Sequence, residues 1–314
     1  MRQWIKFEAP STMASSLNSV TGAWAEGEVP DAKRRQTLLA ADSTTTVKGT
    51  HRGAIRTAIY DLARALKAWR IWVLLGTKDI TQRYRRSTLG QFWITASIGG
   101  MVGGLGIIYS ALFNQPMATY VPYVAAGFVT WFLLSGIITD GCTAFLDAGE
   151  YPKQLTLPLS AYILRQLFKN LLIFAHNLII VPFVWLIFLV PVSWHCLLLL
   201  PGILLIALNG YWMSLLLGTI SARFRDLPLI VSTAMQVIFF ITPIMFHLEQ
   251  TPENLRTLLN LSPFTALLAV ARDPLLGLVP SAQDYALVIG MILLGWCVTI
   301  PFFGKYRGRI AYWL

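Results

Sequence analysis

Long apolar stretches make up most of the chain, and short charged segments separate them. No Asp, Glu, Lys or Arg occurs in residues 87–139 or in residues 170–222. Each of these two runs is long enough for two membrane spans of about 20 residues with a turn between them. Two shorter uncharged runs, 227–248 and 285–304, each hold one more span. The pattern predicts an all-α integral membrane protein with six transmembrane helices, in a domain covering residues 92–304.

Turn residues set the expected limits of these spans. The first span ends where Asn114-Gln115-Pro116 is typical of a turn. In the fifth span, Pro243 removes a backbone donor and is expected to bend the helix, either as part of a gate or as a static kink. The expected spans cover residues 92–113, 121–143, 167–190, 197–221, 228–246 and 285–303.

The segment before the sixth span is cut by prolines into pieces too short to cross a bilayer. Part of it, 263–278, is nevertheless strongly apolar. Irregular backbone at membrane depth needs protein or water beside it, so we expect a pair of short re-entrant or interfacial helices here. The same segment contains Arg272, which we assign to the periplasmic side. The prolines concerned are Pro252, Pro263, Pro274 and Pro280.

An amphipathic pattern precedes the first span. From Ile59 to Val73, apolar residues recur three and four positions apart, while Asp61 and Arg64 lie off this stripe. The spacing predicts a helix lying along the membrane surface, within an interface segment, 56–91, that also holds an entrance loop. A soluble helix that packs on a partner domain would show the same spacing.

Both ends of the chain are polar. Residues 1–55 combine Ser, Thr, Ala and mixed charge without a sustained apolar period, so we expect a disordered cytoplasmic tail. This stretch has no apolar core of a signal peptide, and we expect no cleavage there. Residues 305–314 begin with the basic run Lys305-Tyr306-Arg307 and are expected to form a cytoplasmic C-terminal tail.

Composition and charge agree with a membrane protein and set its orientation. Charged residues make up 13% of the chain and hydrophobic residues 55%, whereas an ordinary soluble domain has about 25% charged residues. With the N-terminus inside, every Lys and Arg except Arg256 and Arg272 falls on the cytoplasmic side. Both termini are therefore expected in the cytoplasm. The net charge of +10 then follows from topology and does not imply nucleic-acid binding.

Motifs for catalysis and for metal binding are absent from the sequence. It contains no GxxxxGK[ST] phosphate loop, no HExxH, no GxSxG and no paired Cys/His cluster. The cysteines Cys142, Cys196 and Cys297 lie in or beside apolar segments and are expected to be small buried hydrophobes. We therefore predict no catalytic residue, no metal site and no cofactor in this chain. An integral glycosyl- or acyltransferase and a secondary transporter stay as alternatives, although uncharged spans leave few groups for either chemistry.

A dense cationic cluster stands just before the first span. The arginines Arg83, Arg85 and Arg86 are followed closely by Leu89-Gly90. One guanidinium group can bind two phosphate oxygens at once, so the cluster suits a phosphate or pyrophosphate head group. An ordinary anchor on the positive side of the membrane would have the same composition.

Glycines and aromatics inside the first two spans carry a further hypothesis. Gly99 with Gly103, and Gly100 with Gly104, form overlapping GxxxG pairs that favour close helix packing, or alternatively line a pore. Aromatic residues gather near one side of the membrane, where they would form either a conduit for sugar rings or ordinary core packing. They are Tyr109, Phe113, Phe128, Trp131 and Phe132.

Several stretches between residues 59 and 314 together resemble the type-2 permeases of ABC exporters. More narrowly, they resemble the members that export polysaccharide, O-antigen, capsule and teichoic acid. The most specific stretch is Arg83-Tyr84-Arg85-Arg86-Ser87-Thr88-Leu89-Gly90-Gln91-Phe92-Trp93. The others are Arg223-Phe224-Arg225-Asp226, Thr242-Pro243-Ile244, the stretch from Ser262-Pro263 to Arg272, and Arg309-Ile310-Ala311-Tyr312-Trp313.

The resemblance implies a transport subunit of the bacterial inner membrane and not an enzyme. It implies a homodimer joined to two copies of a separate ABC ATPase, which binds ATP and Mg²⁺, with a lipid-linked glycan passing between the permeases. A same-fold exporter of drugs or small lipids is the alternative. Contacts with the ATPase would come from the surface helix and from the connector 150–161, with the residues Asp61, Arg64, Glu150, Tyr151 and Lys153.

The resemblance also assigns residues to the substrate. Leu89 and Gly90 would meet the lipid carrier at the cytoplasmic entrance, with Arg83, Arg85 and Arg86 near its phosphate. The first, second and fifth spans would line the channel, with the residues Tyr109, Phe113, Phe128, Trp131 and Phe239.

Overall fold

The computed structural model describes residues 51–83, 92–149 and 157–314, and every regular element among them is a helix. The predicted all-α class is confirmed for this part of the chain. Most of the predicted tail, residues 1–50, lies outside the described residues, and helix α3 (His51–Lys67) already begins at 51 instead of after 55.

Within the described residues, five helical segments are long and apolar enough to cross a membrane. A further apolar helix, α11 (Leu227–Ile241), has only 15 residues. The multi-pass architecture is confirmed, whereas six full-length spans are not. The five segments are α5 (Phe92–Leu112), α6 (Met117–Thr143), α8 (Ser160–Asn177) with α9 (Ile180–Phe188), η2 (Trp194–Leu198) with α10 (Leu199–Arg223), and α14 (Ala282–Trp313).

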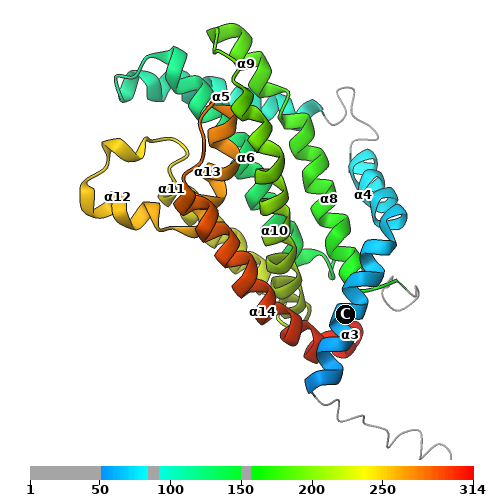
Figure 1. Ribbon diagram of the computed structural model, residues 1–314. Helices are drawn as coiled ribbons and strands as arrows, with labels where there is room; N and C mark the ends of the chain where they lie inside the picture. Colours follow the sequence, from blue (N-terminus) through cyan, green and yellow to red (C-terminus); the bar gives the residue numbers. More distant parts are fainter. Residues whose placement is uncertain (1–50, 84–91, 150–156) are drawn as a thin grey trace, which may run out of the picture. The chain divides into compact units, whose positions relative to one another are not determined.

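Helix α6 is the most buried of these segments, because it is apolar on every side and packs on helices all around it. Figure 1 shows α8, α10 and α13 (Pro263–Leu275) beside it. A Cβ added at Gly141 would overlap Ser214 of α10, so glycine is what allows the two helices to approach. The hydroxyl of Ser214 donates to the Ile137 carbonyl at 3.0 Å and joins the two helices there. These contacts make α6 the wall on which the site below is built.

Two of the predicted spans differ from the structure. The third span is interrupted after Asn177, and the backbone turns through Leu178 and Ile179 before α9 begins. The fifth span ends at Ile241, so the prediction that Pro243 bends a continuing helix was wrong. Thr242 is extended, with ψ 137°, because a residue before proline is excluded from helical backbone angles.

The proline-cut segment folds into the expected pair of short helices, α12 (Glu253–Asn260) and α13. Pro263 occupies the first turn of α13, where a missing N–H costs nothing. Helix α13 is largely buried against α6, α10 and α14, whereas α12 buries only Leu259. Helix α13 itself is therefore surrounded by protein, whereas the irregular segments on either side of it include exposed residues such as Leu261 and Leu278.

The last helix is longer than predicted. A capping box between Ser281 and Asp284 starts α14, and the helix continues to Trp313. Residues 305–313 therefore continue the last helix, and the cytoplasmic position of 305–314 stays a prediction. The basic residues of this stretch are good helix formers, so the end of the apolar run does not end the helix.

The predicted surface helix is two helices, α3 and α4 (Trp69–Arg83), with a break at Ala68. Helix α3 packs on α14 and α8 through a stripe of Ala58, Asp61 and Ala65. Ile59, Leu66 and Trp69 of the predicted stripe are exposed, whereas Leu62 is partly buried against the core. The small residues thus make the contact within the chain, and the exposed large ones remain available to a membrane or a partner.

Candidate translocation groove and the polar junctions around it

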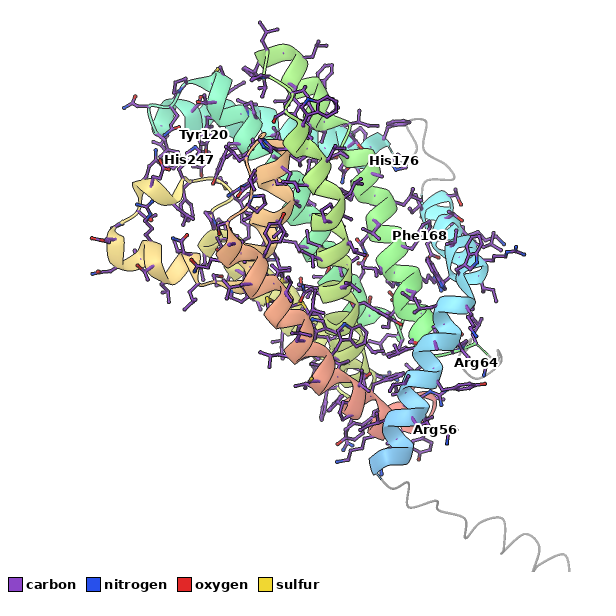
Figure 2. The ribbon with its side chains drawn as sticks, viewed as in Figure 1. Arg56, Arg64, Tyr120, Phe168, His176 and His247 are labelled. Atoms are coloured by element: carbon purple, nitrogen blue, oxygen red, sulfur yellow. The ribbon has the colours of Figure 1, made fainter. Side chains whose placement is uncertain are left out.

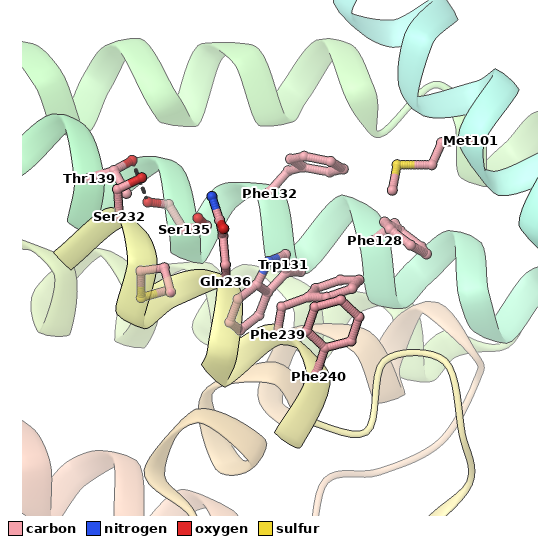
Figure 3. Close-up of a pocket in the computed structure, with 11 residues that line it drawn as sticks. Met101, Phe128, Trp131, Phe132, Ser135, Thr139, Ser232, Gln236, Phe239 and Phe240 are labelled. Carbon is pink, nitrogen blue, oxygen red and sulfur yellow. Dashed lines mark hydrogen bonds between the residues drawn. The ribbon is translucent and has the colours of Figure 1, made fainter. Parts of the chain in front are cut away.

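A cavity of about 530 Å³ lies between α6 and α11, with Met101 of α5 at one end. Figure 3 shows aromatic rings at one end of this groove and hydroxyl and amide groups at the other. Its lining residues are Met101, Phe128, Trp131, Phe132, Ser135, Thr139, Ser232, Met235, Gln236, Phe239 and Phe240.

Helical spacing explains why these residues meet. Along α6 the lining positions are 128, 131, 132, 135 and 139, and along α11 they are 232, 235, 236, 239 and 240. Residues three and four apart lie on one face of a helix, so each helix presents one stripe to the groove.

The rings pack in contact with one another. The centroid of Phe239 lies 5.6 Å from that of Phe128 and 5.7 Å from that of Trp131. These separations are typical of packed aromatic pairs. The aromatic end is therefore a continuous apolar wall formed by both helices.

The groove offers weak binding groups and no reactive ones. Its lining contains hydroxyls and the Gln236 amide, and none of its lining residues is acidic, basic or a cysteine. Ring faces and neutral hydrogen-bonding groups suit a hydroxyl-rich or apolar ligand, but they supply no acid, base or activated nucleophile. The groove is therefore suited to holding a ligand, and its lining offers no group for acid–base or nucleophilic chemistry.

Arg272, a buried residue of α13, lies beside the turn where the chain leaves α11. Nη1 of Arg272 donates to the Tyr123 hydroxyl at 2.9 Å and to the Pro243 carbonyl at 2.8 Å. Asp273 pairs with the same guanidinium at 2.9 Å. Tyr123 in turn donates to the carbonyls of Pro243, at 2.9 Å, and Phe246, at 3.0 Å. The network satisfies the carbonyls of a non-helical turn and neutralises a buried charge.

A histidine covers this network. The ring centroid of His247 lies 4.0 Å from that of Tyr123, and Figure 2 shows His247 beside Tyr120 as well. Partial burial lowers the pKa of His247 from its ordinary value of 6.5, and the nearby Arg272 cation lowers it further. The lowered pKa favours the neutral form of the His247 imidazole.

Asp61 forms a second junction, between α3, α8 and α14. Its Oδ1 accepts from the Ser160 N–H at 3.0 Å and from the Ser160 hydroxyl at 2.6 Å. Nε of Arg307 donates to Oδ2 at 2.7 Å. The carboxylate thus binds the first turn of α8, where backbone N–H groups lack helical partners, and an arginine near the end of α14.

Further ion pairs connect the helices on this side of the chain. Arg165 of α8 donates from Nε to Asp79 of α4 at 2.6 Å. Lys169 of α8 pairs with Asp140 of α6 at 2.9 Å. The ring of Phe168 lies 5.7 Å from that of Trp72, which holds α4 against α8 (Figure 2). Helix α8 therefore connects the surface helices to the wall of the groove.

Residues 71–276 match the ABC-2 type transporter family. The chain belongs to this family. It is 23% identical over 248 residues to an O-antigen export system permease protein RfbA from Klebsiella pneumoniae, a match covering 76% of this chain and 93% of that protein. A protein of the same name from Myxococcus xanthus is 25% identical over 211 residues, or 66% of this chain and 81% of that protein. The predicted resemblance and the prediction of a transport subunit instead of an enzyme are confirmed.

In this ABC-2 transporter the predicted channel residues separate into two groups. Phe128, Trp131 and Phe239 meet in the groove. Tyr109 and Phe113 lie outside its lining and pack on each other at 5.6 Å, near the end of α5. The polar lining residues, such as Gln236, were missed, although they share the helical spacing of the aromatics.

The predicted ATPase contacts also separate. Arg64 is exposed on α3, with its guanidinium 5.7 Å from the Tyr60 ring (Figure 2). The environment of Asp61 differs from the predicted one. Its side chain is 0% exposed and pairs with Arg307 of the same chain instead of facing a partner. Arg83 is the last residue of α4. The other predicted entrance and coupling residues lie outside the described residues: Arg85, Arg86, Leu89, Gly90, Glu150, Tyr151 and Lys153.

Proposed function

We propose that this chain is the permease subunit of an ATP-driven exporter that moves lipid-linked polysaccharide, of O-antigen or capsule type, across the bacterial inner membrane. The groove lined by rings, hydroxyls and an amide is the observation that carries the proposal. The names of the relatives from Klebsiella pneumoniae and Myxococcus xanthus support it, since the Klebsiella match covers 93% of that protein.

The groove suits a sugar polymer on physical grounds. The CH faces of pyranose rings stack on aromatic side chains such as Trp131 and Phe239, and sugar hydroxyls pair with Ser232 and Gln236. These contacts are weak and neutral, so a chain can move from one to the next. A fixed charge inside the groove would hold an anionic polymer too tightly for passage.

A second copy of the chain completes the channel in this proposal. A Cβ added at Gly99, Gly100, Gly103 or Gly104 would meet nothing within 4 Å, so the close packing predicted for these glycines is not made inside the described chain. The groove is also open on one side, where Phe240 is 74% exposed. Both observations support a homodimer in which another permease covers these faces.

Membership of the ABC-2 type transporter family supports the remaining parts of the proposal. Two copies of an ABC ATPase bind ATP and Mg²⁺ and contact the permease through Arg64 on α3 and the connector with Glu150, Tyr151 and Lys153. Both termini face the cytoplasm. The carrier lipid enters there past Leu89-Gly90, and its phosphate is held by the arginines Arg83, Arg85 and Arg86.

Substitutions in the groove test the proposal. Phe239→Leu removes a ring and Gln236→Ala removes the amide, while Val237→Ala changes an exposed neighbour on α11 that does not line the groove. We expect Phe239→Leu and Gln236→Ala to lower surface polysaccharide severalfold at unchanged permease abundance, and Val237→Ala to leave it unchanged. Full surface polysaccharide in both groove variants would contradict the proposed path.

Two further experiments test the substrate and its entrance. Arg85→Gln with Arg86→Gln should leave assembly with the ATPase intact and lower export, because the carrier phosphate loses its cations. Unchanged export would exclude the phosphate role. A deletion strain that becomes sensitive to drugs while its surface polysaccharide stays intact would favour export of drugs or small lipids.

A further inference from the structure

A second cavity, of about 370 Å³, lies between the ends of α10 and α14. Its walls include Ile220 of α10 and Phe302, Tyr306 and Trp313 of α14, and the single charged residue of its lining is Arg223. It shares no lining residue with the groove, which is built from α5, α6 and α11.

Among the described residues, Arg223 forms no ion pair with an acidic residue. Arg165, Arg272 and Arg307 each pair with an aspartate. The guanidinium of Arg223 instead lies 5.6 Å from the Trp313 ring and 5.5 Å from the Phe224 ring. Ring faces orient a guanidinium but leave its N–H donors available. The cavity therefore has an oriented, uncompensated cation at one side.

The opposite walls are apolar and aromatic. The ring centroids of Phe302 and Tyr306 are 4.8 Å apart, and those of Tyr306 and Trp313 are 5.9 Å apart. Nζ of Lys305 lies 5.4 Å from the Tyr306 ring, which adds a second cation close by. Tyrosine and tryptophan beside cations are typical of the boundary between a bilayer and water. A ligand that fits must carry an anionic head and an apolar body.

We propose that this cavity binds an anionic phospholipid of the surrounding membrane. Arg223 donates to its phosphate, Tyr306 and Trp313 lie beside the head group, and Phe302 and Ile220 contact the first acyl carbons. The source is membrane lipid and not the exported substrate, because the lining comes from α10 and α14 and none of it from the groove.

Bound lipid would act on the junction at Asp61. Tyr306 directly precedes Arg307, whose guanidinium binds Asp61 of α3. A lipid that joins α10 to this turn of α14 would hold Arg307 in place beside the carboxylate. Anionic lipid should therefore stabilise the folded chain more than a zwitterionic lipid with the same acyl chains.

The test uses the full chain in detergent, titrated with short-chain phosphatidylglycerol or phosphatidylcholine while thermal unfolding is followed. Arg225→Gln is the matched control, because Arg225 is exposed two positions away, carries the same charge and does not line the cavity. Losing a charge-assisted hydrogen bond should weaken phosphatidylglycerol binding about tenfold in Arg223→Gln. Arg225→Gln removes only a nearby positive charge and should weaken phosphatidylglycerol binding by less than about fivefold.

Each result decides for or against the site. A larger stabilisation by phosphatidylglycerol than by phosphatidylcholine, lost mainly in Arg223→Gln and partly retained in Arg223→Lys, supports it. Equal losses in the Arg223 and Arg225 variants would mean diffuse attraction and would overturn it. Stabilisation by a polyprenyl phosphate but not by phosphatidylglycerol would also overturn it, since the ligand would then be of the carrier type.

Discussion

Arg307 near the end of α14 donates from Nε to Oδ2 of Asp61 in α3, across 2.7 Å. The Asp61 side chain is 0% exposed and that of Arg307 is 31% exposed. Asp61 also accepts from the first turn of α8, so one carboxylate holds three helices. Movement of α3 relative to α14 would have to break this bond. The Asp61 carboxylate therefore links the position of α3 to that of α14.

Asp61→Asn should destabilise the chain strongly. Removing one partner of a buried ion pair costs about 3–5 kcal/mol, and the partial exposure of Arg307 places this pair near the lower end. The measurement is thermal unfolding of the purified chain in detergent. Arg64→Gln, on the exposed face of the same helix, should change stability by no more than about 0.5 kcal/mol.

The double variant Asp61→Asn with Arg307→Gln gives a sharper check. If the two side chains act as a pair, the double variant should be less destabilised than the sum of the two single variants. Additive losses would show that Asp61 acts only through α8.

Tyr123→Phe tests the network that holds the turn after α11. The substitution keeps the ring but removes a hydroxyl that donates to two carbonyls and accepts from Arg272. Unsatisfied buried groups cost about 1–3 kcal/mol, so the unfolding temperature should fall accordingly. Tyr109→Phe is the control, because the Tyr109 hydroxyl makes no hydrogen bond within the described residues. Equal unfolding temperatures for the two variants would contradict a structural role for Tyr123.

The comparison of sequence and structure shows which signals were sufficient. Uncharged runs located the long helices, and Pro252 and Pro263 marked the starts of α12 and α13. Aromatic spacing found Phe128 and Trp131 of the groove, because large residues dominate a hydrophobic pattern. Polar lining residues such as Gln236 give no such signal.

Other features depend on tertiary contacts and could not be predicted in this way. The buried face of α3 consists of small residues, Ala58 and Ala65, with Asp61 between them. A scale of hydrophobicity ranks Ile59 and Leu66 higher and gives no sign that the face with the small residues is the one buried within the chain. Close approach of two helices requires small side chains. The buried Asp61 carboxylate is tolerated there because Ser160 and Arg307, both remote in sequence, donate hydrogen bonds to it.

Lowering the pH should weaken the fold through His247. Its pKa is lowered in the folded state by burial and by Arg272, which outweigh the opposing effect of Glu249. The unfolded chain then binds a proton at its ordinary pKa of about 6.5, before the folded chain does. Stability should therefore fall as the pH drops below about 6.5. His247→Gln should show a shallower decrease between about pH 7 and 5, and identical slopes would exclude His247.

Gly304 of α14 lies against the backbone of α3. A Cβ added there would overlap the carbonyl of Ala54, whereas a Cβ at Gly308, one turn later, would meet nothing within 4 Å. Both glycines lie inside the same helix, where alanine is intrinsically preferred by about 1 kcal/mol. Gly308→Ala should therefore raise the unfolding temperature slightly, and Gly304→Ala should lower it by forcing α3 away from α14.

The two glycine variants also report on the junction at Asp61. Displacing α3 would lengthen the bond between Asp61 and Arg307, so adding Arg307→Gln to Gly304→Ala should cost less than adding it to the parent chain. Thermal unfolding of the four chains measures this difference. If Gly304→Ala is as stable as Gly308→Ala, close backbone approach at this point does not help to hold the two helices together.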